Sequence, residues 1–212
     1  MQKITIKKIL KKKNKLPIVC LTAYSKNIAK IADKYCDIIL VGDSLGMVLY
    51  GMKTTRNVKI ETMIIHAKAV KEAAKRSLVV FDMPYKTYTN KFIAYKNART
   101  VINFTKCDAI KLEGGMKISK IVKYLVKKGI PVLGHIGLLP QTSSNFRVIG
   151  KSSIERKRIL KDALAISKSG AFGILKSKMS SVIPGLSPSV AMSPEKISAI
   201  VLFSESSNII ES

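Results

Sequence analysis

The chain has 212 residues, 47% of them hydrophobic and 24% charged, and its 38 Lys and Arg against 13 Asp and Glu give a formal net charge of +25. This composition excludes a disordered chain, and no apolar run reaches the ~20 residues that span a bilayer, because lysines interrupt each one. The basic amino-terminal segment lacks the apolar stretch of a secretory signal, and Cys20, Cys36 and Cys107 are too widely spaced for a disulfide framework or zinc site, so we expect a cytoplasmic protein.

Short apolar runs rich in β-branched residues alternate with segments of helical periodicity up to about residue 175. This alternation is typical of βα units on a parallel sheet. The runs cover residues 18–24, 37–43, 78–84, 109–114, 131–138 and 171–176. Three of the segments between them have an apolar face, for which we predict Ile28, Ile31 and Ala32; Ile60, Ile64, Ala67 and Val70; and Ile118, Val122 and Leu125.

Six strands in one βα series fit an α/β fold of the (β/α)₈ TIM-barrel type, truncated to about six units, or a doubly wound sheet. The absence of G-x-G-x-x-G after the first strand weakens the dinucleotide-binding form of the second alternative. From residue 176 the chain becomes rich in serine and is broken by three prolines, although 198–203 has the composition of a strand. We therefore expect a partial barrel domain over 1–175 and an atypical tail over 176–212.

Acidic residues are scarce, so their placement is informative. Asp43, Asp82 and Glu113 end the second, third and fourth predicted strands, and Lys111 shares a strand face with Glu113. In parallel βα folds the carboxyl ends of the strands form the ligand-binding rim. Two carboxylates ~4 Å apart repel by about 4 kcal/mol at an effective dielectric constant of 20, so a cluster needs a partner. A hard divalent cation such as Mg²⁺ suits an all-oxygen set, whereas helix capping or pairing with lysines is the structural alternative.

Other polar residues are less specific. Gly42, Ser44 and Gly46 predict a tight turn around Asp43, either one whose amides face an anionic ligand or an ordinary βα turn, which uses the same residues. His135 follows the fifth apolar run and serves either as a ligand contact or as a hydrogen-bonded structural group, whereas His66 fits a packed or half-exposed helical position. No G-x-S-x-G sequence supports a serine hydrolase.

Five segments in collinear order carry a family resemblance: LTAY (21–24), LVGDSLGMVLYG (40–51), DMPY (82–85), KLEGG (111–115) and GHIGLLPQ (134–141). Over residues ~3–174 the chain resembles ketopantoate hydroxymethyltransferase, also called 3-methyl-2-oxobutanoate hydroxymethyltransferase. The resemblance implies a (β/α)₈ barrel that assembles as a homo-oligomer, typically a decamer. It further implies transfer of a one-carbon unit from 5,10-methylenetetrahydrofolate to 3-methyl-2-oxobutanoate, giving 2-dehydropantoate for pantothenate and coenzyme A synthesis.

The same resemblance assigns roles to the residues of the rim. It implies that Asp43, Asp82 and Glu113 bind Mg²⁺. It also implies that the keto acid and its ion are contacted by Asp43, Ser44, Asp82, Lys111 and His135.

The chain departs from the family at one functional position. The family's general base is a glutamate at the end of the next strand, where this chain has Lys176 and Ser177. We therefore assign no catalytic base. Loss of general-base catalysis lowers the reaction rate about 10²–10⁴-fold. The family's last βα units are also missing, and we hypothesise that residues from about 175 onward derive from a frameshift or another truncating event.

Two alternatives to an active transferase stay open. The first is an inactive remnant that retains Mg²⁺ and keto-acid binding. The second is a basic nucleic-acid-binding protein, since the net charge is typical of that class. Lysines spread over nearly every predicted helix, without interleaved aromatic residues, make nucleic acid the least favoured partner, and a compositional bias toward AT-rich codons accounts equally well for them.

Overall fold

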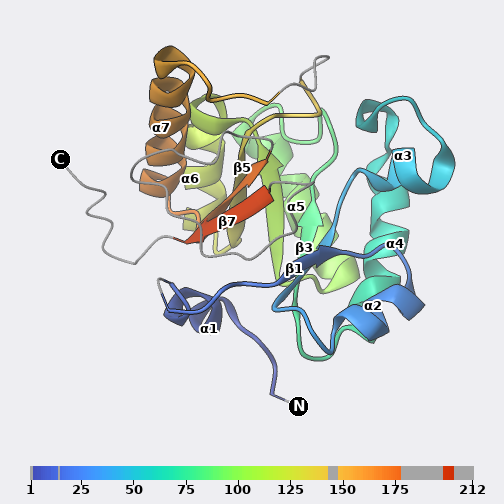
Figure 1. Cartoon of the computed structure of the whole chain (residues 1–212). Helices are drawn as coiled ribbons and strands as arrows, with labels where there is room; N and C mark the ends of the chain where they lie inside the picture. The colour runs from blue at the N-terminus through green and yellow to red at the C-terminus, as the bar shows by residue number, and fades with distance from the viewer. Residues whose placement is uncertain (1, 14, 143–147, 178–197, 203–212) are drawn as a thin grey trace.

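Six parallel strands lie side by side in chain order, and a seventh pairs antiparallel with the sixth (Figure 1). The computed structural model describes residues 2–13, 15–142, 148–177 and 198–202. The strands are β1 (Cys20–Thr22), β2 (Ile38–Val41), β3 (Leu78–Asp82), β4 (Ala109–Glu113), β5 (Val132–Gly137), β6 (Gly173–Ser177) and β7 (Ser198–Leu202). Each of the six predicted runs overlaps one parallel strand, which confirms the α/β fold with a partial barrel.

Helices connect consecutive parallel strands. They are α2 (Lys26–Ala32), α3 (Leu45–Tyr50), α4 (Ile60–Ala73), α5 (Lys91–Thr105), α6 (Ser119–Lys127) and α7 (Ser153–Lys168), together with α1 (Ile6–Lys11) before the sheet and the short 3₁₀ helices η1 (Thr55–Asn57) and η2 (Gly115–Ile118). The side chains of Ser25, Asn90 and Ser152 accept hydrogen bonds from the first-turn amides of α2, α5 and α7. These residues therefore fix where the helices begin.

Two apolar cores lie on opposite faces of the sheet. On one face, alternate strand residues such as Ile39, Phe81 and Leu112 pack against α2 and α4–α7. On the other face, Ile38, Leu78 and Ala109 begin three neighbouring strands and pack with Ile9 of α1. The central strands are therefore buried on both sides, as in the wall of a barrel with its helices outside.

The predicted helix faces are confirmed for α6 and largely for α4, whereas the prediction for α2 is correct for Ala32 and wrong for Ile28 and Ile31. Val122 and Leu125 are buried in α6. In α2, Ile28 and Ile31 are more than half exposed, and the helix is buried through Ala29 and Ala32 instead. Small alanine side chains let α2 approach α4 closely, and this turns the larger isoleucines outward.

The sheet has two edges within the described residues. β1 pairs with β2 alone, and β7 covers the outer edge of β6. The strand predicted over 198–203 is thus confirmed as β7, whereas most of the predicted tail domain lies outside the described residues and its origin stays a hypothesis. In the described part of the chain, no helix is both long and apolar enough to cross a membrane.

Candidate functional site at the carboxyl ends of the strands

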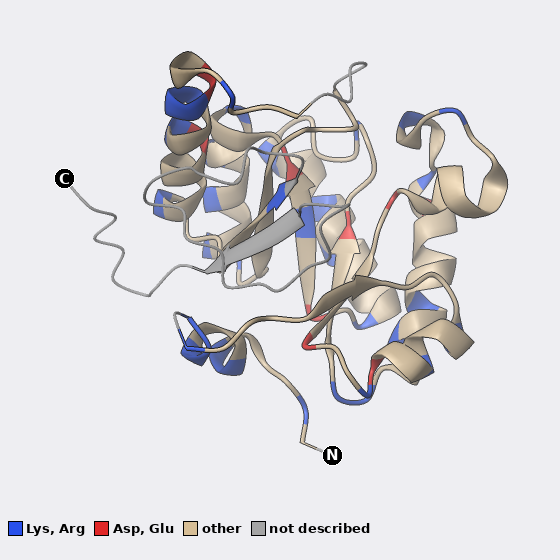
Figure 2. Ribbon diagram, in the orientation of Figure 1, with Lys and Arg blue, Asp and Glu red and all other residues tan. Residues whose placement is uncertain are grey.

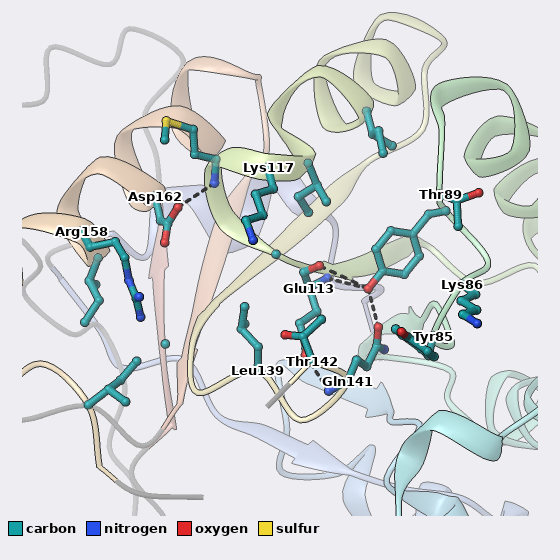
Figure 3. A pocket seen from close by; sticks show the side chains of 18 residues that line it. Tyr85, Lys86, Thr89, Glu113, Lys117, Leu139, Gln141, Thr142, Arg158 and Asp162 are labelled. Atoms are coloured by element: carbon teal, nitrogen blue, oxygen red, sulfur yellow. Dashed lines mark hydrogen bonds between the residues drawn. The ribbon is translucent and has the colours of Figure 1, made fainter. Parts of the chain in front are cut away.

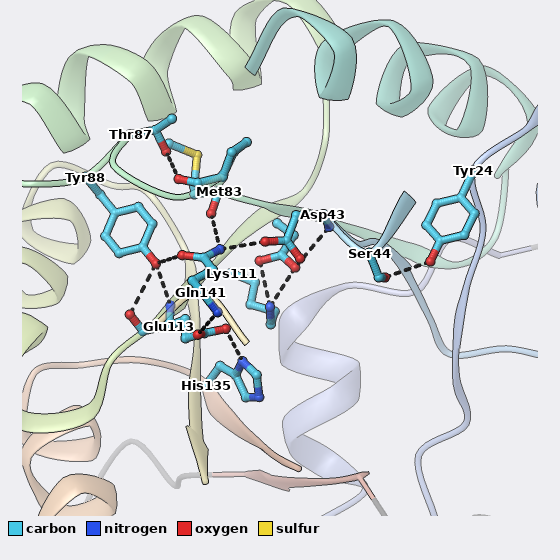
Figure 4. Close-up of polar contacts among 12 residues, drawn as sticks. Tyr24, Asp43, Ser44, Met83, Thr87, Tyr88, Lys111, Glu113, His135 and Gln141 are labelled. Carbon is cyan, nitrogen blue, oxygen red and sulfur yellow. Dashed lines mark hydrogen bonds and ion pairs between the residues drawn. The ribbon is translucent and has the colours of Figure 1, made fainter. Parts of the chain in front are cut away.

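The predicted rim residues converge at one end of the sheet (Figure 4). Asp43 follows β2, Asp82 ends β3, and Glu113 ends β4. The register pairs Asp82 with Lys111 and Glu113 with His135, so these side chains are direct neighbours across adjacent strands. All five are buried. We refer to Asp43, Asp82, Lys111 and Glu113 as the acidic centre.

A buried ion pair forms the middle of the acidic centre. The Lys111 Nζ atom lies 2.6 Å from both carboxylate oxygens of Asp82. The backbone N–H of Asp43 donates to Asp82 Oδ2 at 3.3 Å. Burial, opposed by Lys111 and reinforced by Asp43, raises the pKa of Asp82 to about 8. Burial lowers the pKa of Lys111, but the surrounding carboxylates outweigh it and raise that pKa above its usual value.

Glu113 contacts His135 on the neighbouring strand. The His135 Nδ1 atom lies 3.1 Å from Glu113 Oε2. Burial, and then the charge of Lys111, lowers the pKa of His135 well below its usual value, so the imidazole is neutral and its Nδ1–H donates to the carboxylate. Burial raises the pKa of Glu113 to about 7. Of the two roles left open for His135, the structure shows the hydrogen-bonded one; a ligand contact stays a prediction.

Gln141 is a site residue that the sequence analysis did not single out. It lies on the loop after β5, is 1% exposed, and its Nε2 donates to Asp43 Oδ2 at 2.8 Å and to the carbonyl of Met83 at 3.0 Å. Its backbone N–H donates to Glu113 Oε1 at 2.7 Å, and its Oε1 accepts from the hydroxyl of Tyr88. Gln141 ends the GHIGLLPQ segment, which was the only sequence signal for it.

Ser44 lies at the outer side of the acidic centre, where α3 begins. Its Oγ is 2.7 Å from the hydroxyl of Tyr24, a residue of the LTAY segment. Gly42 must be small here, because a Cβ atom at this position would lie 2.9 Å from Ser44 Oγ. The turn thus holds the Ser44 hydroxyl against Tyr24 (Figure 4), and the predicted contact of Ser44 with the keto acid stays a prediction.

His66 and Lys176 lie outside this network. His66 is half-buried on α4, where Nδ1 lies 2.6 Å from the Tyr24 carbonyl and Nε2 lies 2.8 Å from the Tyr50 hydroxyl, as expected of a structural group. Lys176 pairs with Ile136, which belongs to the helix-side core. Paired residues of parallel strands share a face, so Lys176 lies on the opposite face from His135. Burial lowers the pKa of Lys176.

The donor set of the acidic centre fits a divalent cation. Three buried carboxylates surround one buried ammonium, so a full set of ionised carboxylates leaves negative charge in need of a counter-ion. Among the described residues, no group of three or more His, Cys, Asp or Glu side chains is placed to hold a metal ion. Because Mg²⁺ usually takes one or two carboxylates and completes its shell with water or substrate, the partial set suits this ion.

A cavity of about 630 Å³ adjoins the acidic centre (Figure 3). Glu113, Tyr88 and Gln141 belong both to its lining and to the hydrogen-bond network. Its other walls come from the loop after β3, from η2 and α6, and from α7. The described site therefore has two adjoining parts, a charged centre and a larger cavity.

Residues 3–185 match the family model of ketopantoate hydroxymethyltransferase. A 3-methyl-2-oxobutanoate hydroxymethyltransferase of Pelagibacter ubique is 54% identical over 172 residues, covering 80% of this chain and 67% of the relative. Its namesake from Rhizobium etli is 47% identical over 178 residues, covering 82% of this chain and 65% of the relative. The chain thus spans about two thirds of the length of these relatives.

Solved structures with low sequence identity share the fold. A phosphonopyruvate hydrolase in complex with oxalate and Mg²⁺ superposes with a TM-score of 0.59 at 11% identity, covering 74% of this chain and 57% of that chain. A 2,3-dimethylmalate lyase, described as a member of the PEP mutase/isocitrate lyase superfamily, gives a TM-score of 0.55 at 13% identity, covering 80% and 60%. At such identity these likenesses show the fold alone.

Proposed function

Since the chain belongs to the ketopantoate hydroxymethyltransferase family, we propose that its acidic centre binds 3-methyl-2-oxobutanoate together with Mg²⁺. The full proposed reaction transfers a hydroxymethyl group from 5,10-methylenetetrahydrofolate, with uptake of water, and gives 2-dehydropantoate and tetrahydrofolate. The observation that carries the proposal is the buried Asp82–Lys111 ion pair at the carboxyl ends of β3 and β4, with Asp43 and Glu113 buried nearby and joined to each other through Gln141. The phosphonopyruvate hydrolase that holds oxalate and Mg²⁺ on the same fold adds support.

Asp43 and Asp82 are the residues that would hold the ion. Glu113 is joined to Asp43 through Gln141, which donates hydrogen bonds to both carboxylates. When bound, Mg²⁺ supplies Lewis-acid polarisation of a keto oxygen and neutralises charge on an enolate. The predicted role of Glu113 as a third ligand stays part of the proposal.

The chain's own groups prepare the site for an anionic substrate. Lys111 keeps its positive charge because its pKa is raised, so it stabilises negative charge that develops on the substrate. The Ser44 hydroxyl, oriented by Tyr24, donates to a substrate carboxylate. Neutral His135 lines the same pocket without adding charge. Burial of Lys111 and His135 excludes water and strengthens their interactions, whereas Ser44 is half-buried.

The end of β6 favours a binding site with slow turnover over an efficient enzyme. The family's general base would come from this strand end, where Lys176 lies on the helix-side face. Without a carboxylate base we expect turnover about 10²–10⁴-fold below that of a full-length relative. A remnant that binds both the keto acid and Mg²⁺ without turnover is therefore the second candidate function.

Calorimetric titration of 3-methyl-2-oxobutanoate in the presence of Mg²⁺ tests the proposal. We expect binding that Asp82→Asn weakens at least tenfold, because the buried pair with Lys111 and the ion contact are both lost. Glu61→Gln, which removes an exposed carboxylate on α4, is the control and should leave the affinity unchanged. Absence of binding to the folded chain with Mg²⁺ would reject the proposal, whereas a folate-coupled assay separates the active enzyme from the remnant.

A further inference from the structure

His66 is half-buried on α4 and lies outside the acidic centre, yet both of its ring nitrogens are engaged. We propose that His66 is a positioning residue, which holds the Ser44 hydroxyl in place through Tyr24 and through the helix α3. The inference rests on the proposed function, because Ser44 is one of the groups expected to contact the keto acid. It adds to that function a residue that acts without touching the substrate.

The partners of His66 determine which ring nitrogen carries the hydrogen. Nδ1 lies 2.6 Å from the carbonyl oxygen of Tyr24, which can only accept, so Nδ1–H is the donor. In the neutral imidazole Nε2 is then an acceptor, and the hydroxyl of Tyr50 donates to it at 2.8 Å. The rings of His66 and Tyr50 also meet edge to face, with their centroids 5.9 Å apart. His66 is therefore held between two tyrosines.

These two tyrosines contact the two ends of α3. The hydroxyl of Tyr24 lies 2.7 Å from Oγ of Ser44, the residue immediately before the first turn of the helix (Figure 4). Tyr50 is the last residue of the helix. His66 thus holds the end of α3 directly and its beginning through Tyr24.

Packing buries little of α3, so these hydrogen bonds have a large share in placing it. The helix has six residues, of which only Leu45 and Gly46 are buried, and Figure 1 shows it at the periphery of the molecule. Each side chain from residue 47 to residue 50 is at least 42% exposed. Because a helix this short is marginal without outside support, the contacts at its ends decide where its first turn and Ser44 lie.

Calorimetric titration of 3-methyl-2-oxobutanoate with Mg²⁺ tests the inference on the full chain. We expect His66→Ala to weaken binding about 3- to 10-fold, the range for loss of one hydrogen bond. His66→Asn places an amide N–H where Nδ1 carries its hydrogen, so it should restore the affinity to within about twofold of the wild type. His66→Gln, whose amide reaches the position of Nε2 instead, should not restore it. Ile65→Ala truncates an exposed neighbour on α4 and is the control.

A double-mutant cycle with Ser44→Ala separates positioning from a merely structural role. The Ser44 side chain makes no capping hydrogen bond to α3, so its truncation leaves the start of the helix intact. If His66 acts through Ser44, His66→Ala should change the affinity less than about twofold in the Ser44→Ala background. An equal loss in both backgrounds, or failure of His66→Asn to restore binding, overturns the inference.

Hydrogen exchange of α3 without ligand keeps the test independent of the keto acid. The backbone N–H groups of Met47 and Val48 both donate to the Ser44 carbonyl at 3.0 Å and report on the first turn. We expect them to exchange about 3- to 10-fold faster in His66→Ala than in the wild type, and His66→Asn to reverse the change. Equal exchange in His66→Ala and Ile65→Ala overturns the inference. A wild-type chain that does not bind the keto acid counts against the proposed function alone, because exchange still decides whether His66 holds α3.

Discussion

Gln141 has only one amide orientation that satisfies its neighbours. Nε2 faces two acceptors, the Asp43 carboxylate and the Met83 carbonyl, while Oε1 accepts from the Tyr88 hydroxyl. A flipped amide would place its oxygen against both acceptors, and both contacts would become repulsive. Gln141 also donates its backbone N–H to Glu113. Because its side chain donates to Asp43, Gln141 fixes the distance between Asp43 and Glu113.

Substitution of Gln141 tests this role. We expect Gln141→Ala to lower the free energy of unfolding by about 1–3 kcal/mol, because buried acceptors lose their donor, and to weaken keto-acid binding as Asp43 becomes free to move. Urea denaturation and calorimetry measure the two effects. Asn57→Ala removes an exposed amide and is the control. Equal losses in the two variants would contradict the role of Gln141.

The raised pKa values of Asp82 and Glu113 predict how pH and Mg²⁺ act together. Their pKa values, about 8 and about 7, exceed those of the unfolded chain, near 4, so the folded protein binds these protons more tightly. Their contribution to stability is complete below about pH 4 and is lost as the pH rises through 7 and 8. Mg²⁺ competes with the same protons, so we expect it to raise Tm more at pH 8.5 than at pH 6.

Thermal unfolding with and without Mg²⁺ at the two pH values measures this effect. Asp82→Asn should remove most of the difference, since it removes a proton and an ion contact together. A shift in Tm that is the same at both pH values would contradict the prediction.

Sequence analysis located the charged residues of the site but not the residues that connect them. Asp43, Asp82 and Glu113 could be predicted to converge because they end consecutive parallel strands, and strand ends share one rim. Tyr88 and Gln141 lie on loops, whose course depends on packing that no local pattern encodes. The neutral state of His135 likewise follows from burial and from Lys111, both of which are properties of the folded chain.

β5 and α7 are in close contact at a glycine. A Cβ atom on Gly134 would lie 2.5 Å from Cγ2 of Ile166, so only glycine lets the helix rest on the strand at this point. β5 carries His135 at the next position, and the neighbouring loop carries Gln141. The helix–strand distance therefore also sets the position of the site.

Gly134→Ala tests the close approach of these elements. We expect a loss of about 1–3 kcal/mol in the free energy of unfolding, because the added methyl group overpacks the contact. The double variant Gly134→Ala/Ile166→Ala removes the clashing methyl group, so its loss should be smaller than the sum of the two single losses. Additive losses in chemical denaturation would show that the clash is relieved elsewhere.

The elements were predicted more successfully than the helix faces. Strands buried on both sides have continuous apolar runs, which explains why the runs overlapped the strands from β2 onward, whereas β1 is an exposed edge strand. Ile28 and Ile31 of α2 were wrongly predicted to be buried, because large hydrophobic side chains were expected to be buried. In a close helix contact, Ala29 and Ala32 are the buried residues, and Ile28 and Ile31 are exposed.

At the scale of the whole molecule, the sheet has an exposed edge beside a strongly basic surface. Within the described residues β1 pairs with β2 alone, and Leu21 on β1 is 51% exposed. Figure 2 shows Lys and Arg on helices all around the sheet. An open strand favours pairing with another chain, whereas a net charge of +25 opposes it.

Salt should therefore promote self-association. We expect light scattering to show a larger mean mass at 0.5 M than at 0.05 M NaCl, since screening removes the repulsion. Leu21→Lys should reduce this association, because a charge on an edge strand blocks pairing. Leu16→Lys, at an exposed residue outside any strand, is the control. Equal effects of both variants would show that β1 is not the contact.

The overall topology was only partly predictable. The six βα units follow from the alternation of apolar runs and amphipathic segments, and their parallel order follows from the right-handed crossovers that such units make. The antiparallel pairing of β7 with β6 could not be predicted from the sequence. Residues 198–202 have the composition of a strand, but no sequence pattern indicates which strand they pair with.

Packing of α1 has a practical consequence for experiments on this chain. Ile9 and Ile18 close the interior of the sheet at Ile38 and Leu78, the first residues of two strands, which is the end remote from Asp82 and Glu113. α1 therefore closes this end of the sheet to small molecules. An amino-terminal tag joins the chain at the end of the sheet remote from the acidic centre, so the titrations described above can be run on protein immobilised through that tag.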